Sequence, residues 1–465
     1  MNKKEFKELL DKKIVVLDGA TGSNLQKRGM PTGVCPELWI CEHPEVLQGL
    51  QREYAEAGSD IVYAPTFGGN RIKMEEYGLK DRIEEINTRL VQISREGVGN
   101  TVLVAGDITM TGAQLEPLGD LSFEELVDVY KEQISYIEKA GADLIGVETM
   151  MSLQETRAAV IAAKEVCPEM PIMATLSFSE TGKTLYGADA ASAVVVLQDL
   201  GVDAVGLNCS AGPDKMKSVF EKMKSVAKIP LIVKPNAGLP QIDAEGNTCY
   251  DMKADDFKGY MKEIIEAGAG VIGGCCGTSP EYIKALKEAV EEYKAGKGAE
   301  SDCCSSSGVS CCPACGKDTV CFASEREVFQ LPVGKELELG EGIDLSADED
   351  ILDEYKNDEY ETATDSAFEL MDDEVDALLF KADVEGIDEA EALTAMIANV
   401  SSMVSLPVIA AVSCADTAEQ VLRHYSGVMG IMPLFESESE IQKLFSTLKC
   451  YGAKMVTIDK QILCC

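Results

Sequence analysis

The chain has 465 residues, more than one ordinary hydrophobic core accommodates, so we expect two domains. Its formal charge of −38, from 42 basic and 80 acidic residues, repels nucleic acid and anionic membrane surfaces, so neither is an expected partner. The N-terminus is too polar for a signal peptide and no segment is apolar over a bilayer-spanning length. We therefore expect a cytoplasmic protein whose cysteines are mostly reduced.

Short apolar runs alternate with segments of helical spacing through residues 1–295. In four segments a helix end and a glycine precede the apolar run: Glu56–Thr66, Lys139–Thr149, Asp199–Cys209 and Glu266–Cys276. Four more runs lie between them: Ile14–Asp18, Val102–Asp107, Ile172–Ser177 and Leu231–Asn236. Eight buried strands that alternate with helices predict a (β/α)8 TIM barrel. The alternative is an open doubly wound sheet, which the lack of a glycine-rich dinucleotide loop after the first strand disfavours.

Chemically capable side chains stand where these strands end. In a TIM barrel the active site lies at the C-terminal ends of the strands. The residues expected there are Asp18, Thr66, Asp107, Glu148, Ser177, Cys209, Asn236, Cys275 and Cys276. A purely structural rim would not require such residues, so we predict an active site at this end of the barrel.

Three of these strand-end residues are cysteines. Cys209 ends the sixth strand, and Cys275 and Cys276 end the eighth, so their thiols can meet across the seventh. Three thiolates with one open position are typical of a catalytic zinc site. Asn236, at the end of the seventh strand, could supply a labile fourth ligand. The alternatives are cysteines that pack as small core residues and a vicinal disulfide.

A zinc ion with an open position would accept a substrate thiol and hold it as the thiolate. No histidine base is then needed, and the chain contains only His43 and His424. The reaction we predict is attack by a substrate thiolate on an activated alkyl group.

Seven collinear motifs within residues 1–295 resemble the homocysteine S-methyltransferase domain, above all the N-terminal module of cobalamin-dependent methionine synthase. They are Asp18–Gly22, Pro65–Arg71, Glu116–Asp120, Glu148–Thr149, Gly206–Cys209, Pro235–Gly238 and Gly273–Thr278. The resemblance implies a TIM barrel with zinc on Cys209, Cys275 and Cys276, and homocysteine thiolate as the nucleophile. It also implies that Asp18 and Glu148 bind the amino group of homocysteine.

Other residues of these motifs are further candidates for substrate binding. The backbone amides of Ala20, Thr21, Gly22 and Ser23 could hold the substrate carboxylate. Thr66 and Asn208 are additional candidates, and Asp18 could instead only cap the helix that follows it. Asp107 departs from the family pattern, in which a small residue is usual, and could reshape the donor side of the pocket.

A cysteine-rich join spans residues 296–324. Cys311, Cys312 and Cys315 have the spacing of a metal knuckle and could form a second zinc or iron–sulfur site. The alternative is a disordered linker, since no second Cys-x-x-Cys completes the site.

Residues 325–465 form the predicted second domain, an acidic α/β segment of about five β/α steps. Asp353–Asp376 is predicted as one helix. The domain resembles, more weakly, the first half of the pterin-binding barrel of methionine synthase. Its polar strand ends are altered at Gly340–Asp344, Lys381–Asp383 and Ile431–Met432, which predicts that folate binding is lost. Because a half-barrel exposes apolar edges, it should pack on the first domain, form a homodimer or fold as a compact sandwich.

The function predicted is therefore zinc-dependent methyl transfer to homocysteine, giving methionine. No Asp-x-His-x-x-Gly run occurs in the chain, so the expected donor is methylcobalamin on a separate corrinoid protein. One alternative is an S-methyltransferase that uses betaine, S-methylmethionine or another methyl donor or thiol acceptor. A second is a non-catalytic interaction protein that senses zinc or thiols.

Overall fold

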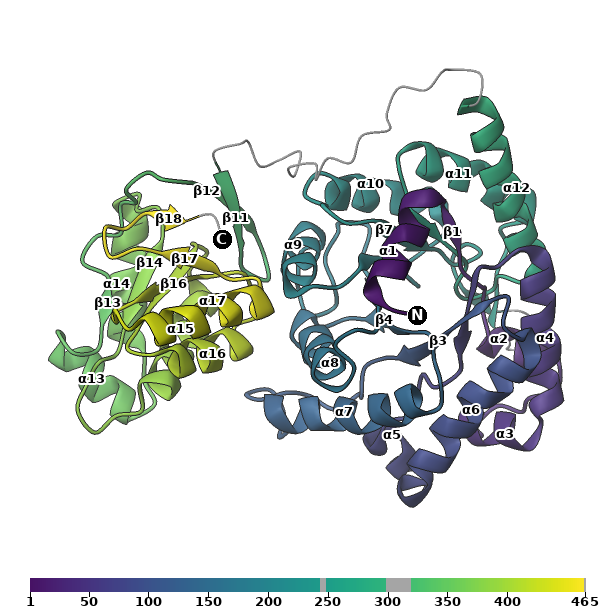
Figure 1. The fold of residues 1–465 in the computed structure, drawn as a ribbon, viewed down its shortest axis with the longest axis horizontal. Coiled ribbons are helices and arrows are strands. Elements are labelled where there is room, and N and C mark those ends of the chain that lie inside the picture. The colour runs from purple at the N-terminus through teal and green to yellow at the C-terminus, as the bar shows by residue number, and fades with distance from the viewer. Residues whose placement is uncertain (243–247, 298–318, 464–465) are drawn as a thin grey trace. The chain divides into compact units, whose positions relative to one another are not determined.

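The computed structural model describes residues 1–242, 248–297 and 319–463, and these form two compact units (Figure 1). The predicted boundaries at residues 295 and 324 stay a prediction. Cys311, Cys312 and Cys315 lie outside the described residues.

The first unit is built on eight parallel strands. They are β1 (Val15–Val16), β2 (Ile61–Ala64), β3 (Leu103–Ile108), β4 (Leu144–Met150), β5 (Ile172–Leu176), β6 (Ala204–Asn208), β7 (Leu231–Lys234) and β10 (Val271–Ile272). Their order in the sheet is β1-β10-β7-β6-β5-β4-β3-β2, and a parallel bridge between Leu17 and Ile61 joins the two ends. The sheet thus closes into the predicted barrel.

Helices follow the strands and surround them in Figure 1. The main crossover helices are α4 (Pro44–Ala57), α6 (Ile83–Val98), α7 (Phe123–Lys139), α8 (Leu153–Val166), α9 (Ala190–Leu200), α10 (Pro213–Lys224), α11 (Ala254–Glu266) and α12 (Pro280–Lys297). Shorter elements lie between them: α2 (Gly22–Lys27), α3 (Pro36–Glu42), α5 (Arg71–Glu76), a 3-10 turn (Lys80–Arg82) and the hairpin β8 (Gln241–Ile242) and β9 (Thr248–Cys249).

The helix ends follow from local sequence. A capping box begins α7, in which the Ser122 side chain accepts from the Glu125 amide and Glu125 accepts from the Ser122 amide. Helices α4 and α9 end at Gly58 and Gly201, whose positive φ values of 108° and 98° glycine adopts without steric cost. These are two of the glycines predicted to end helices before a strand.

Helix α1 (Lys3–Lys12) lies across the barrel in Figure 1. It closes the end of the barrel at which the strands begin. Phe6 of α1 is fully buried against the first residues of the strands, among them Val15, Ile61 and Val271. Leu9 and Leu10 pack on the same cluster. Apolar side chains therefore seal this end, and the polar residues gather at the other.

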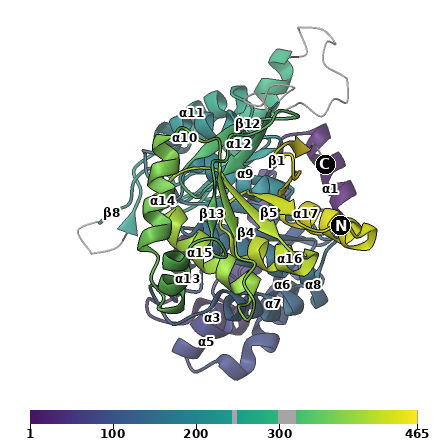
Figure 2. The same ribbon diagram turned by 90° about the vertical axis from the view of Figure 1, so that its left-hand side faces the viewer.

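The second unit holds a six-stranded sheet in chain order: β13 (Ile343–Asp344), β14 (Leu378–Lys381), β15 (Val408–Val412), β16 (Gly430–Pro433), β17 (Lys454–Val456) and β18 (Ile462–Leu463). All neighbouring pairs are parallel except β17 and β18. Its helices are α13 (Glu349–Lys356), α14 (Glu361–Asp372), α15 (Glu389–Met403), α16 (Ala415–His424) and α17 (Glu438–Tyr451), and Figure 2 turns them toward the viewer. The smaller α/β domain is thus confirmed.

An antiparallel hairpin of β11 (Thr319–Ala323) and β12 (Val328–Pro332) covers one face of this sheet. Its Phe322 and Leu331 pack against Leu379 and Ile409. Because α15 and α16 contact β14 and β15, apolar residues on both faces of the sheet are buried. Strand β11 begins within the range predicted as the join.

One predicted helix was wrong. Residues 353–376 form parts of two helices, α13 and α14, instead of one. The chain turns between them at Asp358, which has a positive φ of 59° that interrupts helical geometry. Among the described residues, no helix combines the length and apolar character needed to cross a membrane.

Candidate metal and substrate site

A cavity of about 290 Å³ opens at the C-terminal ends of the barrel strands. Nine of the predicted site residues line it: Asp18, Ala20, Thr21, Gly22, Ser23, Glu148, Cys209, Cys275 and Cys276. Thr66, Asn208 and Asn236 lie outside its lining. Asp107, predicted at this end of the barrel as a residue that could reshape the pocket, also lines it. So do Lys234 and Tyr63, which were not predicted from the sequence.

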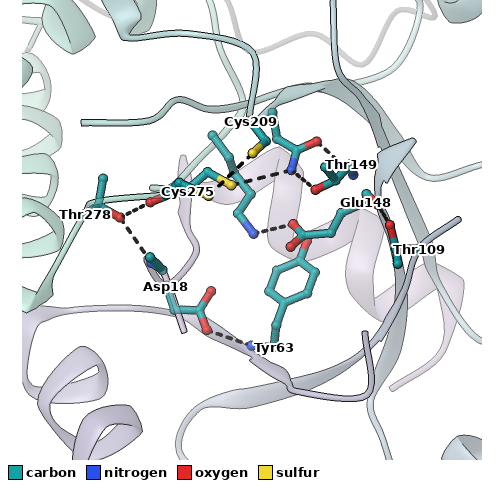
Figure 3. A network of polar contacts seen from close by, with 12 residues as sticks. Asp18, Tyr63, Thr109, Glu148, Thr149, Cys209, Cys275 and Thr278 are labelled. Atoms are coloured by element: carbon teal, nitrogen blue, oxygen red, sulfur yellow. Dashed lines mark hydrogen bonds and ion pairs between the residues drawn. The ribbon is translucent and has the colours of Figure 1, made fainter. Parts of the chain in front are cut away.

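The three thiols meet as predicted, and Figure 3 labels two of them, Cys209 and Cys275. The ligand atoms of Cys209, Cys275 and Cys276 all lie within 4.8 Å of one another, and the Cys209 and Cys276 sulfurs are 3.6 Å apart. Tetrahedral zinc with bonds of about 2.3 Å would separate its sulfur ligands by about 3.8 Å. The donor set and its spacing therefore fit zinc.

Unusual backbone geometry aims two strand ends at the cavity. Cys209 and Thr149 have φ values of 50° and 59°, in the left-handed region that non-glycine residues seldom adopt. The buried Asn208 side chain joins these two ends, because its Oδ1 accepts from the Thr149 amide at 3.0 Å and its Nδ2 donates to Thr149 Oγ1 at 2.7 Å. Asn208 thus holds β6 against β4 beside the thiols.

The Cys275–Cys276 turn depends on glycine. A Cβ atom on Gly274 would lie 2.3 Å from Thr278 Oγ1, which is tighter than any van der Waals contact. The Thr278 hydroxyl donates to the Cys275 carbonyl at 2.7 Å and accepts from the Ala20 amide at 3.1 Å. Thr278 therefore links the cysteine turn to the loop after β1.

Hydrogen bonds among the three thiols shift their pKa values. Hydrogen bonds from Cys209 and Cys275 lower the pKa of Cys276 to about 3, against the opposing effect of burial. One thiolate is thus stabilised before any metal binds. Metal binding requires all three to be deprotonated.

Asp18 lies at the end of β1, almost fully buried. Its Oδ2 accepts from the Tyr63 amide at 2.8 Å, whereas its Oδ1 has no hydrogen-bond partner among the described residues. Burial raises the pKa of Asp18 to about 7, although Lys234 acts to lower it. Asp18 does not cap the next helix, since the N-cap residue of α2 is Thr21.

Glu148 forms a buried ion pair that the sequence did not reveal (Figure 3). Lys234 Nζ lies 2.6 Å from Glu148 Oε2 and 3.8 Å from the centre of the Tyr63 ring. Burial lowers the pKa of Lys234, but Glu148, Tyr63 and Asp18 raise it well above its usual value. A lysine within the apolar run Leu231–Asn236 was the available signal, because lysine is almost never buried unless it is paired.

The loop after β1 presents further polar groups. Ser23 Oγ is buried and has no partner among the described residues. The Asn24 side chain donates to the carbonyls of Ala20 and Thr278, both at 2.7 Å, and so fixes the loop. The residues predicted to hold a carboxylate therefore lie on a rigid part of the cavity wall.

The remaining predicted residues support the wall from behind. The Thr66 hydroxyl donates to the Asp107 carbonyl and accepts from the Asp107 amide, both at 2.8 Å. Asn236 is buried, and its Oδ1 has no partner among the described residues. Such an orphaned oxygen is compatible with the labile metal ligand predicted from the sequence.

Comparisons with known proteins agree with this geometry. Residues 15–290 match the family model for homocysteine S-methyltransferase. Methionine synthase from Mycobacterium leprae is 32% identical over 308 residues, which are 61% of this chain and 25% of the relative. Methionine synthase from Mycobacterium tuberculosis is also 32% identical, over 306 residues, 62% of this chain and 25% of the relative. The chain spans about a quarter of the length of these curated relatives.

Solved structures show the same fold. The metallated form of the homocysteine methyltransferase MmuM from Escherichia coli is 23% identical and has a TM-score of 0.52. The match covers 60% of this chain and 98% of MmuM. Since the family match spans more than half of the chain, this protein belongs to the homocysteine S-methyltransferase family.

Proposed function

We propose that the chain transfers a methyl group to the thiol of homocysteine, forming methionine, with zinc held by Cys209, Cys275 and Cys276. The observation that carries this proposal is the pairing of two features in one cavity. Three thiols converge at one part of its wall, and buried carboxyls stand at another. Membership of the homocysteine S-methyltransferase family supports the choice of substrate.

Different residues would bind the thiol, the amino group and the carboxylate of the substrate. Zinc, when bound, would lower the pKa of the substrate thiol and so supply a thiolate at neutral pH. Asp18 and Glu148 would attract the amino group through charge-assisted hydrogen bonds. Ser23 and the amides of Ala20, Thr21 and Gly22 would face the carboxylate. Asn236 would serve as the fourth zinc ligand when the thiol is absent.

The transfer itself needs no further base. The substrate sulfur forms a bond to the methyl carbon while the bond from methyl to donor breaks, and the donor keeps that electron pair. We propose a methylated corrinoid protein as the donor, and these 465 residues contain no Asp-x-His-x-x-Gly run of their own to bind the corrinoid. Betaine and S-methylmethionine are the alternative donors that the experiment must include.

Turnover tests the proposal directly. Zinc-loaded protein is incubated with homocysteine and either a methylated corrinoid protein, betaine or S-methylmethionine, and methionine is measured by mass spectrometry. We expect methionine with the corrinoid donor. Methionine from another donor would overturn the donor assignment, and none from any donor would favour the sensor function.

Metal content tests the ligands separately. Cys209→Ser should lose the zinc held at the barrel, because a hydroxyl is a poor replacement for a thiolate ligand. Cys167→Ser is the matched control, since the Cys167 thiol is buried in the barrel and, among the described residues, donates to the Ala163 carbonyl at 3.2 Å and belongs to no group of possible metal ligands. Equal zinc in the two variants, measured by plasma mass spectrometry, would contradict the assignment.

A further inference from the structure

The cavity is lined by more acidic than basic side chains. Four carboxyl groups line it, those of Asp18, Glu37, Asp107 and Glu148, together with one ammonium group, that of Lys234. The Lys234 ammonium group forms an ion pair with Glu148, with 2.6 Å between Nζ and Oε2. Glu37 has no cationic partner in contact, but its Oε1 accepts from the Gly68 amide and its Oε2 from the Cys35 thiol. Two carboxyls, those of Asp18 and Asp107, are left with neither a cationic partner in contact nor a full set of hydrogen bonds, and buried polar groups normally require one or the other.

Asp107 is one of these two. It lies at the end of β3, is only 5% exposed, and its Oδ1 has no hydrogen-bond partner among the described residues. Its backbone is held on both sides by the Thr66 hydroxyl. A fixed, buried acceptor at a cavity wall is costly to leave unsatisfied, which points to a donor supplied by the ligand.

Asp18 shows the same combination of features. Its Oδ1 is also buried without a partner among the described residues, and its other oxygen accepts from the Tyr63 amide. Tyr63 lies between the two positions in the sheet order, since β2 pairs with β3 and its bridge to Leu17 joins it to β1. The free oxygens of Asp18 and Asp107 thus come from neighbouring parts of the cavity wall.

We propose that Asp107 determines substrate specificity by binding, together with Asp18, the ammonium group of an amino-acid thiol. This inference rests on the proposed function and adds a third carboxyl to its amino-group site. An ammonium group supplies both the positive charge and the several N–H donors that the two free oxygens lack. A thiol without an amino group would leave both oxygens unsatisfied.

Burial and the nearby charge of Glu148 raise the pKa of Asp107 well above its usual range. A cation bound at its oxygen would favour the ionised form. Binding of the ammonium group and ionisation of Asp107 should therefore assist each other. A neutral thiol ligand would gain nothing from this carboxyl.

The test compares two thiols that differ only in the amino group, L-homocysteine and 4-mercaptobutanoate. Their dissociation constants are measured on the full chain loaded with Co²⁺, from the thiolate-to-cobalt absorption band. Asp107→Asn keeps the shape of the side chain and removes its charge. We expect homocysteine to bind about 10- to 100-fold more weakly to this variant, and 4-mercaptobutanoate to bind as tightly as to the wild type.

Glu155→Gln is the matched control. Glu155 is equally buried in the barrel, but it accepts from Thr111 and Tyr130 and does not line the cavity. The Glu155→Gln variant should change the affinities for homocysteine and 4-mercaptobutanoate by the same factor. Asp107→Ser tests the same contact if Asp107→Asn does not fold.

The outcomes separate this inference from the function on which it rests. An equal effect of Asp107→Asn on both thiols, or no effect on homocysteine, would overturn the role of Asp107 while the proposed function stands. Failure of the wild-type protein to bind homocysteine would overturn both.

Discussion

At the scale of single residues, the site is marked by buried ionisable side chains, which are rare in protein interiors. Asp18, Asp107, Glu148 and Lys234 are all buried, and only the last two form an ion pair with each other. Cys209 and Thr149 add backbone strain beside them. Such groups persist at functional sites because the surrounding structure holds them in place, at a cost that the rest of the fold offsets.

The pKa of Asp18 predicts how stability depends on pH. Burial raises that pKa from 3.8 to about 7, so between these values the folded state binds a proton that the unfolded state has released. The free energy of unfolding of the metal-free protein should therefore fall as pH rises from about 4 to about 7. This carboxyl contributes at most about 1.4 kcal/mol per pH unit.

Urea denaturation of the metal-free wild type and of Asp18→Asn, across this pH range, checks the expectation. The variant lacks the titrating group, so the stability of the wild type relative to the variant should decline with rising pH. A difference that stays constant with pH would show that Asp18 titrates normally.

At the scale of elements, close strand packing places the residues proposed to bind the metal. Gly206 lies in the middle of β6, and a Cβ atom there would lie 1.9 Å from the Ile232 carbonyl oxygen of β7. The backbones of β6 and β7 can therefore lie this close together only because Gly206 has no side chain. Strand β6 leads into Cys209, and β7 ends in Lys234, so this approach governs the spacing of the site.

Gly206→Ala should therefore destabilise the protein by about 1–3 kcal/mol or more, and should weaken zinc binding, because a strand must shift. The control is Gly259→Ala in α11, where a Cβ atom would meet nothing within 4 Å. That variant should stabilise the helix by about 0.5–1 kcal/mol and leave zinc affinity unchanged. Urea denaturation and zinc titration measure both effects, and equal zinc affinities would refute the packing argument.

At the scale of the whole molecule, the two sheets differ in the chemistry of their strand ends. The barrel brings thiols, carboxyls and an ammonium group to one cavity. In the second sheet, Lys381 and Asp344 lie 3.6 Å apart as an ion pair, and Asp344 also accepts from Ser346. The end of β16 is apolar, with Ile431 and Met432 buried. These strand ends offer few free polar groups to a ligand.

We therefore expect the chain not to bind methyltetrahydrofolate. A pterin ring needs several hydrogen-bond partners, and a site without them rejects it. Calorimetric titration of the zinc-loaded chain should give no binding heat with methyltetrahydrofolate. Titration with homocysteine in the same buffer serves as the control for a competent sample, and tight folate binding would contradict the expectation.

The alternation of apolar runs with helical spacing was sufficient to predict the barrel and its eight strands, because that pattern is local in the chain. The position of Cys209, Cys275 and Cys276 at strand ends likewise predicted that they would meet, since parallel strands of a barrel end at one rim. The helix predicted over residues 353–376 failed because a single turn at Asp358 is not visible in the spacing.

Only the tertiary structure decided which side chains face the cavity and which lie behind it. Thr66 and Asn208 stand at strand ends, yet they bind the backbone of Asp107 and Thr149, whereas Lys234 reaches Glu148 across the barrel. In strands buried on both faces, sequence alone does not show which residues point inward. By itself the sequence determined the fold, the family and the three cysteines that come together at the strand ends. The partners of the buried charges depend on distances between strands far apart in the chain, and these exist only once the barrel closes.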